Sequence, residues 1–96
     1  MRLSQPERKA LKTALTGFEG EVYLFGSRLD PHKRGGDIDI LLKPTHKIDR
    51  YELKTSIASK FERVLEQSLD VVVYDDQSIF CREINKNAQR LDLAGL

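Results

Sequence analysis

The sequence lacks the features that several classes of protein require. It contains one cysteine, Cys81, which excludes an internal disulfide and fits the reducing cytoplasm. No apolar run approaches the ~20 residues that a membrane-spanning helix needs, and no signal-peptide pattern opens the chain. We therefore expect neither a disulfide framework nor a membrane anchor, and we expect a cytoplasmic protein.

An excess of charge of one sign is also missing. The 96 residues include 16 basic and 15 acidic side chains, which gives a formal net charge of +1. Proteins that coat DNA or RNA are usually far more basic, because neutralisation of phosphates dominates their binding. We therefore expect no strong nucleic-acid binding, and we expect any phosphate to be bound at a local site.

The length predicts a single domain, residues 1–96. A chain of this size buries only roughly 60–65% of the surface of its unfolded state, so its core leaves little spare stability. No internal repeat or linker divides the chain. We therefore expect one compact sheet that either suffices for folding or docks onto a partner.

Hydrophobic periodicity predicts a small α/β protein. Ser4 and Glu7 have the spacing of a helix capping box, and Asp49 precedes a second amphipathic stretch. The expected helices cover residues 5–17, about 50–66 and a short stretch that ends near Asn87. The expected strands cover residues 22–25, 37–42 and 69–74, with a small edge strand at 90–93.

The lengths of the connections predict the directions of the strands. Residues 26–36 are rich in glycine and charge and include Pro31, so a crossover helix is not expected there. Strand 37–42 should therefore run antiparallel to strand 22–25. The helix that follows is long enough to place strand 69–74 parallel to strand 37–42. The end of the first strand and the beginnings of the other two then meet at one end of the sheet.

Three aspartates fall at this end of the predicted sheet. Asp37 and Asp39 are two positions apart, so their side chains share one face of a strand, with Cα atoms ~7 Å apart. Asp70 is near the beginning of the neighbouring strand, ~4.8 Å away. Clustered carboxylates repel one another unless a cation is present, and oxygen ligands suit Mg²⁺. These aspartates are the candidate metal ligands and catalytic residues of a phosphoryl displacement.

A glycine–serine pair follows the first predicted strand. Gly26 lets a phosphate approach the backbone, and the Ser27 hydroxyl and nearby amides can donate hydrogen bonds to its oxygens. Arg28 adds a permanent positive charge with a fork geometry suited to phosphate. Gly26, Ser27 and Arg28 are therefore the candidate nucleotide-binding residues. The segment His32-Lys33-Arg34 either adds positive charge opposite the carboxylates or forms a solvated loop.

With these residues in place, the sequence resembles the minimal nucleotidyltransferase (MNT) family of the DNA polymerase beta superfamily. The family motif is a glycine–serine pair, nine or ten residues, and then Asp-x-Asp. Here Gly26-Ser27 is followed by nine residues and by Asp37-Ile38-Asp39. Asp70, in the segment LDVVVY, stands where the family has its third acidic residue. The likeness extends from residue 22 to about residue 93.

The resemblance implies a fold like the polymerase beta palm, with a small mixed sheet and helices packed mainly on one face. It implies two Mg²⁺ ions held by the three aspartates, and ATP as a substrate whose triphosphate lies against residues 26–28. Many such short proteins are antitoxins paired with HEPN-domain RNase toxins. The implied reaction is therefore transfer of AMP from ATP to a tyrosine hydroxyl of a toxin partner.

Two departures from the family pattern bear on this hypothesis. The residue before the first aspartate is often serine in the family, but here it is Gly36, so one hydroxyl contact is missing. The chain also has no second domain for an acceptor, so the acceptor is expected to be supplied by a partner.

Simpler interpretations stay open beside the catalytic one. An Asp-x-Asp pair also occurs where a turn leads into a strand, and Gly-Ser is often only a turn. The hypothesis therefore depends on their combination at one end of the sheet. Two other functions remain: a non-catalytic binding module that neutralises a toxin by contact, and a nucleotidyltransferase acting on a small molecule. Tyr23, Tyr74 and Cys81 are expected to be core or sheet residues.

Overall fold

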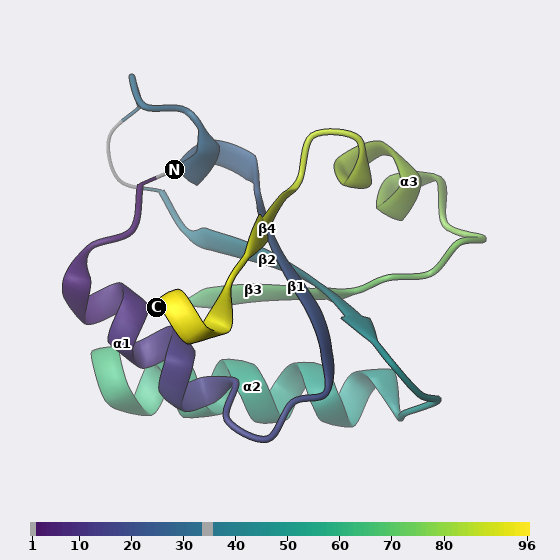
Figure 1. Cartoon of the computed structure of the whole chain (residues 1–96), viewed down its shortest axis with the longest axis horizontal. Helices are drawn as coiled ribbons and strands as arrows, with labels where there is room; N and C mark the ends of the chain where they lie inside the picture. Colours follow the sequence, from purple (N-terminus) through teal and green to yellow (C-terminus); the bar gives the residue numbers. More distant parts are fainter. Residues whose placement is uncertain (1, 34–35) are drawn as a thin grey trace.

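The computed structural model describes residues 2–33 and 36–96, which form helices and strands in the predicted order (Figure 1). The helices are α1 (Gln5–Ala14), α2 (Arg50–Leu65) and α3 (Ile79–Asn85). The strands are β1 (Gly20–Phe25), β2 (Ile38–Pro44), β3 (Leu69–Val73) and β4 (Gln89–Leu91). Two short 3₁₀ turns, η1 (Gly26–Leu29) and η2 (Leu93–Gly95), complete the set.

The four strands form one mixed sheet in the order β3-β2-β1-β4. β2 runs antiparallel to β1 and parallel to β3, which confirms both predicted strand directions. The reason is the connection in each case: a loop that contains η1 follows β1, whereas the 16-residue helix α2 joins β2 to β3. β4 pairs antiparallel with β1 at the edge of the sheet, where the alternating sequence had predicted an edge strand.

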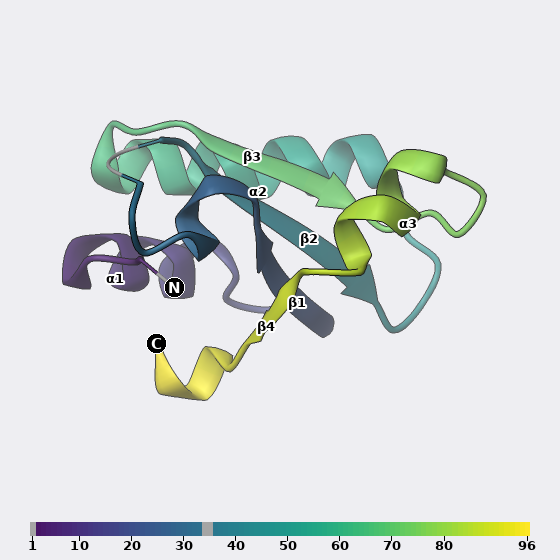
Figure 2. The same cartoon turned by 90° about the horizontal axis from the view of Figure 1, so that it is seen from above.

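The two long helices lie together on one side of the sheet, while η1 and α3 lie on the other (Figures 1 and 2). Along β2, Ile38, Ile40 and Leu42 all belong to the main core, together with Leu11 of α1 and Phe61 of α2. Because side chains alternate along a strand, the residues between them face the other side. The predicted arrangement, with helices packed mainly on one face, is confirmed.

Local signals account for the beginnings of both long helices. Ser4 caps α1: its hydroxyl accepts from the Glu7 amide at 3.2 Å, and the Glu7 carboxylate accepts from the Ser4 amide at 2.9 Å. The carboxylate of Asp49 accepts from the Glu52 amide at 3.0 Å at the start of α2. Both predicted caps are therefore confirmed, since each depends only on residues three positions apart.

The ends of several elements differ from the predicted ones. α1 ends at Ala14 rather than near residue 17, because residues 15–17 form a turn that closes with Gly17 at a φ of +86°. β1 begins at Gly20, two residues earlier than predicted, because it pairs with β2 as far as Pro44. A Cβ at position 20 would collide with the carbonyl oxygen of Lys43, so only glycine allows this pairing.

The beginning of β2 differs in a way that matters for the site. The strand starts at Ile38, so Asp37 lies just outside the ladder instead of opening it. α3 and β4 end two residues earlier than predicted, at Asn85 and Leu91. Among residues 2–33 and 36–96, no helix is both long enough and apolar enough to cross a membrane.

Candidate active site

The end of β1 and the beginnings of β2 and β3 meet at one end of the sheet, as predicted. The strand register places Phe25 opposite Asp39, and Asp39 opposite Asp70. The neighbours Ile38 and Ile40 point into the main core, so Asp39 faces the side of the sheet away from α1 and α2. Asp70 pairs with it on the adjacent strand and shares this face. Two of the three predicted carboxylates are therefore brought together.

Asp39 and Asp70 form a negative pair, and no lysine, arginine or histidine of the described residues forms an ion pair with either of them. The pKa of Asp39 is raised from its ordinary value of 3.8 to about 6. Burial is the largest cause, followed by the side chain and charge of Asp70 and then by the charge of Asp37. In the part of the chain that the structure describes, the ion pairs lie elsewhere, and none involves these aspartates. The site carries negative charge that the described side chains leave unneutralised.

Asp37 lies beside this pair without joining it. Its side chain is exposed, and no strand partner holds it, because the ladder begins one residue later. Among residues 2–33 and 36–96, no three His, Cys, Asp or Glu side chains are close enough to share a metal ion as they stand. The three-carboxylate cluster predicted from the spacing is thus only partly assembled, and metal ligation by all three remains a prediction.

The chemistry of these side chains nevertheless fits a divalent cation. Carboxylate oxygens are the ligands that Mg²⁺ prefers. A cation between Asp39 and Asp70 would offset the repulsion that raises the pKa of Asp39. Asp37 is exposed and directly precedes the strand, and its charge contributes to the raised pKa of Asp39.

Gly26 holds the turn after β1 directly against Asp39. Its φ is +80°, a conformation that other residues rarely adopt. A Cβ at this position would collide with Oδ2 of Asp39. Two independent constraints therefore require glycine here, and together they bring the backbone of η1 next to the carboxylate pair.

Ser27 and Gly36 face each other across the same loop. A Cβ at position 36 would lie 2.5 Å from Oγ of Ser27, and Gly36 itself has a φ of +86°. A side chain at position 36 would therefore displace the Ser27 hydroxyl. This contact gives a local steric reason for the glycine that stands where the family often has serine.

Arg28 is directed into the protein rather than toward the open face of the sheet. Its side chain is buried and forms a two-pronged ion pair with Glu7, from Nη1 to Oε1 at 2.8 Å and from Nη2 to Oε2 at 2.7 Å. Its Nε donates to the Gly36 carbonyl at 3.0 Å, and Nη1 also donates to the Arg2 carbonyl at 2.9 Å. Four of its five N–H groups are thus used within the protein. Direct contact of Arg28 with phosphate remains a prediction.

Glu7 and its second partner, Gln67, were not identified as site residues from the sequence. Nε2 of Gln67 donates to Oε2 of Glu7 at 2.7 Å. The pKa of Glu7 is lowered from 4.5 to about 2, chiefly by the hydrogen bond from Arg28 and against the effect of burial. The capping-box signal located Glu7 correctly, but it gave no sign of a partner 21 residues away.

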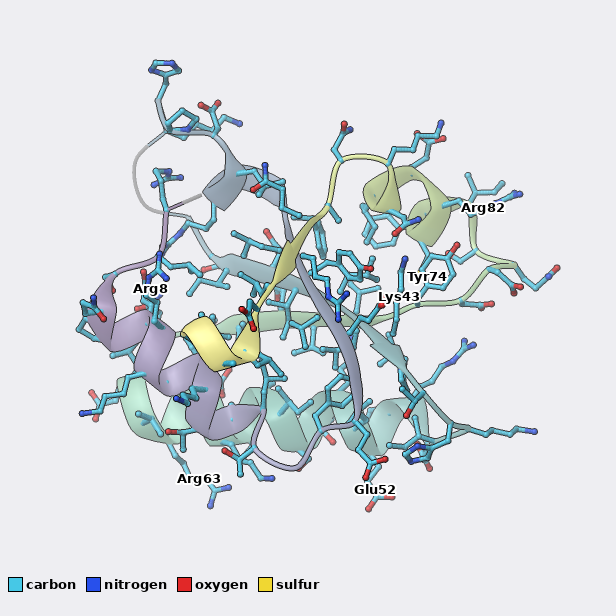
Figure 3. All side chains as sticks on the ribbon, viewed as in Figure 1. Arg8, Lys43, Glu52, Arg63, Tyr74 and Arg82 are labelled. Carbon is cyan, nitrogen blue, oxygen red and sulfur yellow. The ribbon has the colours of Figure 1, made fainter. Side chains whose placement is uncertain are left out.

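The other described residues that the sequence analysis named lie outside this cluster. His32 and Lys33 are exposed, and Arg34 lies outside the described residues. Nζ of Lys43 lies 4.6 Å from the ring centre of Tyr23 and 4.9 Å from that of Tyr74, so both tyrosines contact a lysine of the sheet. Figure 3 labels Lys43 and Tyr74. Cys81 is buried, as expected for a small core residue.

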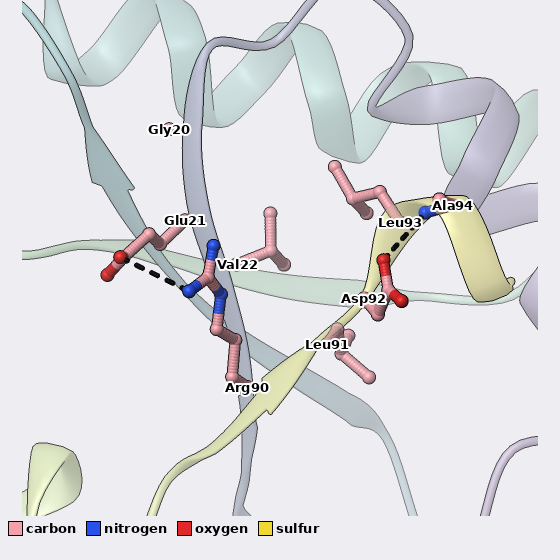
Figure 4. Close-up of a pocket in the computed structure, with 8 residues that line it drawn as sticks. All are labelled: Gly20, Glu21, Val22, Arg90, Leu91, Asp92, Leu93 and Ala94. Carbon is pink, nitrogen blue, oxygen red and sulfur yellow. Dashed lines mark hydrogen bonds and ion pairs between the residues drawn. The ribbon is translucent and has the colours of Figure 1, made fainter.

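A cavity of about 600 Å³ lies beside β1 and β4 (Figure 4), away from Asp39 and Asp70. It is lined by residues 20–22, at the beginning of β1, whereas Asp39 pairs with the last residue of that strand. The charged side chains in it have partners: Arg90 pairs with Glu21 at 3.5 Å, and Asp92 accepts from the Ala94 amide at 3.1 Å. The cavity therefore shares no residue with the candidate site.

The sequence of this chain matches a family model described as polymerase beta, nucleotidyltransferase. The match covers residues 20–91, from the first residue of β1 to the last residue of β4. It therefore includes the glycine–serine turn and all three aspartates. None of the curated proteins with which the sequence was compared matches it.

Several solved structures share this fold, among them the following three. A chain from a mutant of the toxin–antitoxin pair MntA–HpeT has a TM-score of 0.65 and 21% identity. A chain from a toxin–antitoxin structure with AMP-PNP has a TM-score of 0.65 and 22% identity. A chain from the complex of tri-AMPylated Shewanella oneidensis HEPN toxin with MNT antitoxin has a TM-score of 0.58 and 19% identity. Each match covers 86% of this chain and 70% of the other.

Proposed function

Since this chain belongs to the polymerase beta, nucleotidyltransferase family, we propose that it transfers AMP from ATP to a hydroxyl group of a protein partner. We further propose that the partner is a HEPN-type toxin and that this chain is its antitoxin. Both would act in the cytoplasm, where ATP and Mg²⁺ are available. The observation that carries the proposal is the pairing of Asp39 with Asp70 beside the Gly26 turn, because it joins an uncompensated negative site to a backbone suited to phosphate.

In this proposal, Asp37, Asp39 and Asp70 hold divalent cations, and two Mg²⁺ ions are expected. When bound, the cations would neutralise charge on the phosphates and lower the pKa of the acceptor hydroxyl. The raised pKa of Asp39 supports this assignment, since a carboxylate that is costly to ionise alone gains most from a cation. Asp37 is exposed at the start of the same strand and would supply the third carboxylate to the cations.

The turn after β1 is proposed to hold the triphosphate of ATP. Gly26 keeps the backbone of η1 free of a side chain beside Asp39, and the Ser27 hydroxyl and the amides of the turn would donate to phosphate oxygens. Gly36 leaves room for that hydroxyl. Arg28 supports the same turn from its buried side, and its one remaining N–H group is the part available for a phosphate.

The proposed step is an in-line displacement at the α-phosphorus of ATP. The acceptor oxygen forms a bond to phosphorus, the bond from phosphorus to the bridging oxygen breaks, and pyrophosphate leaves. Asp70, whose side chain is exposed to solvent, accepts the proton of the acceptor hydroxyl. A tyrosine hydroxyl has an ordinary pKa of ~10, so the reaction requires such a base or a cation to remove its proton.

The solved structures with the same fold support a protein as the acceptor. One contains a toxin–antitoxin pair with AMP-PNP, and another contains a HEPN toxin that carries three AMP groups in complex with an MNT antitoxin. These findings concern those proteins. They motivate a search for an acceptor among the partners of this chain.

The proposal is tested by incubating the protein with Mg-ATP labelled on the α-phosphate and with the product of the neighbouring gene. We expect label on that partner, and we expect Asp39→Asn to reduce labelling by at least ~10³-fold, because the variant loses the central carboxylate. Asp76→Asn is the matched control: it removes the same charge from an exposed loop position. Equal labelling by wild type and Asp39→Asn would refute the assignment of the site.

A binding module without catalysis is the second candidate function. Ile79 and Phe80 of α3 are 71% and 57% exposed, which favours a surface that contacts another protein. The same experiment separates the two candidates. A stable complex that forms without transfer of label would support neutralisation by contact.

A further inference from the structure

We infer that a buried network of Glu7, Arg28 and Gln67 positions the nucleotide-binding turn relative to the aspartates. The effect on catalysis rests on the proposed function, whereas the effect on geometry does not. The network lies behind the candidate site and joins segments that are far apart in the sequence. No sequence motif identifies it as a unit.

The centre of the network is the ion pair between Glu7 on α1 and Arg28 in η1. Nη1 of Arg28 donates to Oε1 of Glu7 at 2.8 Å, and Nη2 donates to Oε2 at 2.7 Å. The two side chains are only 9% and 10% exposed. A two-pronged pair of this kind fixes orientation as well as distance. It therefore holds η1, and with it Ser27, against the first turn of α1.

Two further bonds extend the network to the segments that precede the aspartates. Nε of Arg28 donates to the carbonyl of Gly36, the residue immediately before Asp37. Nε2 of Gln67 donates to Oε2 of Glu7, and Gln67 stands three residues before Asp70. Each segment that leads into an outer part of the site is therefore tied to one ion pair.

The strand ladder already fixes the other two aspartates, Asp39 and Asp70, which pair with each other across β2 and β3. Asp39 lies within β2 and is paired with a residue of β1 on one side and of β3 on the other. Ser27 and Asp37 lie outside the ladder, so strand pairing does not place them. The network thus supplies positional restraint where the sheet supplies none.

The composition of the network fits positioning better than stability alone. Replacement of a buried ion pair by apolar residues is often neutral or stabilising, so such a pair is weak evidence of a stabilising role. Here every buried side-chain nitrogen and oxygen atom of the described residues has a hydrogen-bond partner. A polar network in which each buried atom has a partner favours one geometry. Displacements of ~1 Å at a reacting centre can change rates by ~10²-fold.

The test replaces Arg28 with lysine, which keeps the charge but loses the fork that reaches Glu7 and Gly36 together. Arg50→Lys is the matched control, because Arg50 forms an exposed ion pair with Asp75 at 3.1 Å, outside the site. Gln67→Leu is the gentler second variant, since it removes one donor and leaves the ion pair intact.

The first measurement uses amide chemical shifts and hydrogen exchange of the complete chain, without partner or nucleotide. In Arg28→Lys we expect changes at three separate segments, around residues 27, 37 and 67, and we expect none of these in Arg50→Lys. Changes confined to residues next to position 28 would overturn the inference. This result does not depend on any enzymatic activity.

The second measurement uses transfer of label at saturating ATP, at a temperature where all variants are folded. We expect Arg28→Lys to lower kcat by ~10–100-fold, and Gln67→Leu to lower it by a smaller factor, while Arg50→Lys stays at the wild-type rate. Wild-type kcat in both Arg28→Lys and Gln67→Leu would overturn the positioning role. If the wild-type protein itself transfers no label, the proposed function fails, and the shift and exchange data alone decide the inference.

Discussion

The carboxylates of Glu7 and Asp39 lie in opposite electrostatic environments, and their pKa values are shifted in opposite directions. Behind the site, Glu7 is buried against Arg28, with a bond to each of its oxygens. In front, Asp39 lies opposite Asp70, a group of the same sign. The pKa of Glu7 is lowered to about 2, chiefly by Arg28, whereas burial and Asp70 raise that of Asp39 to about 6.

The difference separates a structural carboxylate from the one that we propose to be functional. Burial disfavours the charged form in both cases, so the sign of the nearest partner decides the direction of the pKa. Glu7 has its positive partner within the chain, and its charge is part of the folded structure. The described residues provide Asp39 with no such partner. The comparison therefore distinguishes the two roles on electrostatic grounds.

The largest expected effect on stability comes from removing the charge of Glu7. Glu7→Gln leaves the Arg28 guanidinium buried without its carboxylate, so we expect the free energy of unfolding to fall by about 3 kcal/mol. Urea denaturation at pH 7 measures this change. The matched variant Glu83→Gln removes a carboxylate from the exposed pair with Lys86 and should cost less than ~0.5 kcal/mol. Equal losses in the two variants would remove the contrast between the buried pair and an ordinary surface pair.

Removing the charge of Asp39 should raise the free energy of unfolding, whereas removing that of Glu7 lowers it. Asp39→Asn relieves a carboxylate that is costly to ionise, so we expect the metal-free protein at pH 7 to gain roughly 1–2 kcal/mol of stability. Thermal unfolding in the presence of a chelator measures the gain. Added Mg²⁺ should reduce the difference in stability between Asp39→Asn and the wild type, because only the wild type retains the full set of carboxylates that bind it. A variant that is less stable than the wild type without metal would contradict the comparison.

The smallest expected effect is the pH dependence of that gain. The folded pKa of Asp39 lies above its ordinary value, so the folded state binds more protons between pH 4 and pH 6. Stability of the metal-free wild type should therefore fall as pH rises through this window. The advantage of Asp39→Asn should be absent near pH 4 and complete above pH 6. Glu7 acts in the other direction, since its stabilising effect is lost as pH falls from 4.5 toward 2. An advantage of the variant that stays constant from pH 4 to pH 7 would contradict the Asp39 assignment.

Features that depend on neighbouring residues could be predicted from the sequence. The capping box at Ser4 and the cap at Asp49 each act over three residues, and both are present. The strand directions followed from the lengths of the connections, and these directions placed Asp39 and Asp70 at the same end of the sheet. The position of Asp37 did not follow, because the ladder begins one residue later than the sequence pattern suggested and leaves its side chain exposed.

The sequence by itself therefore determined the elements, their directions and the end of the sheet where Asp39 and Asp70 meet. Periodicity, capping and loop length are short-range properties, and each is encoded within a few consecutive residues. Only the tertiary structure decided which charge Arg28 neutralises. Its partner Glu7 is 21 residues away, and Gln67 reaches Glu7 across 60 residues. Such bonds form only after the packing of α1 and α2 on the sheet has brought these segments together, and the sequence pattern contains no signal of that distance.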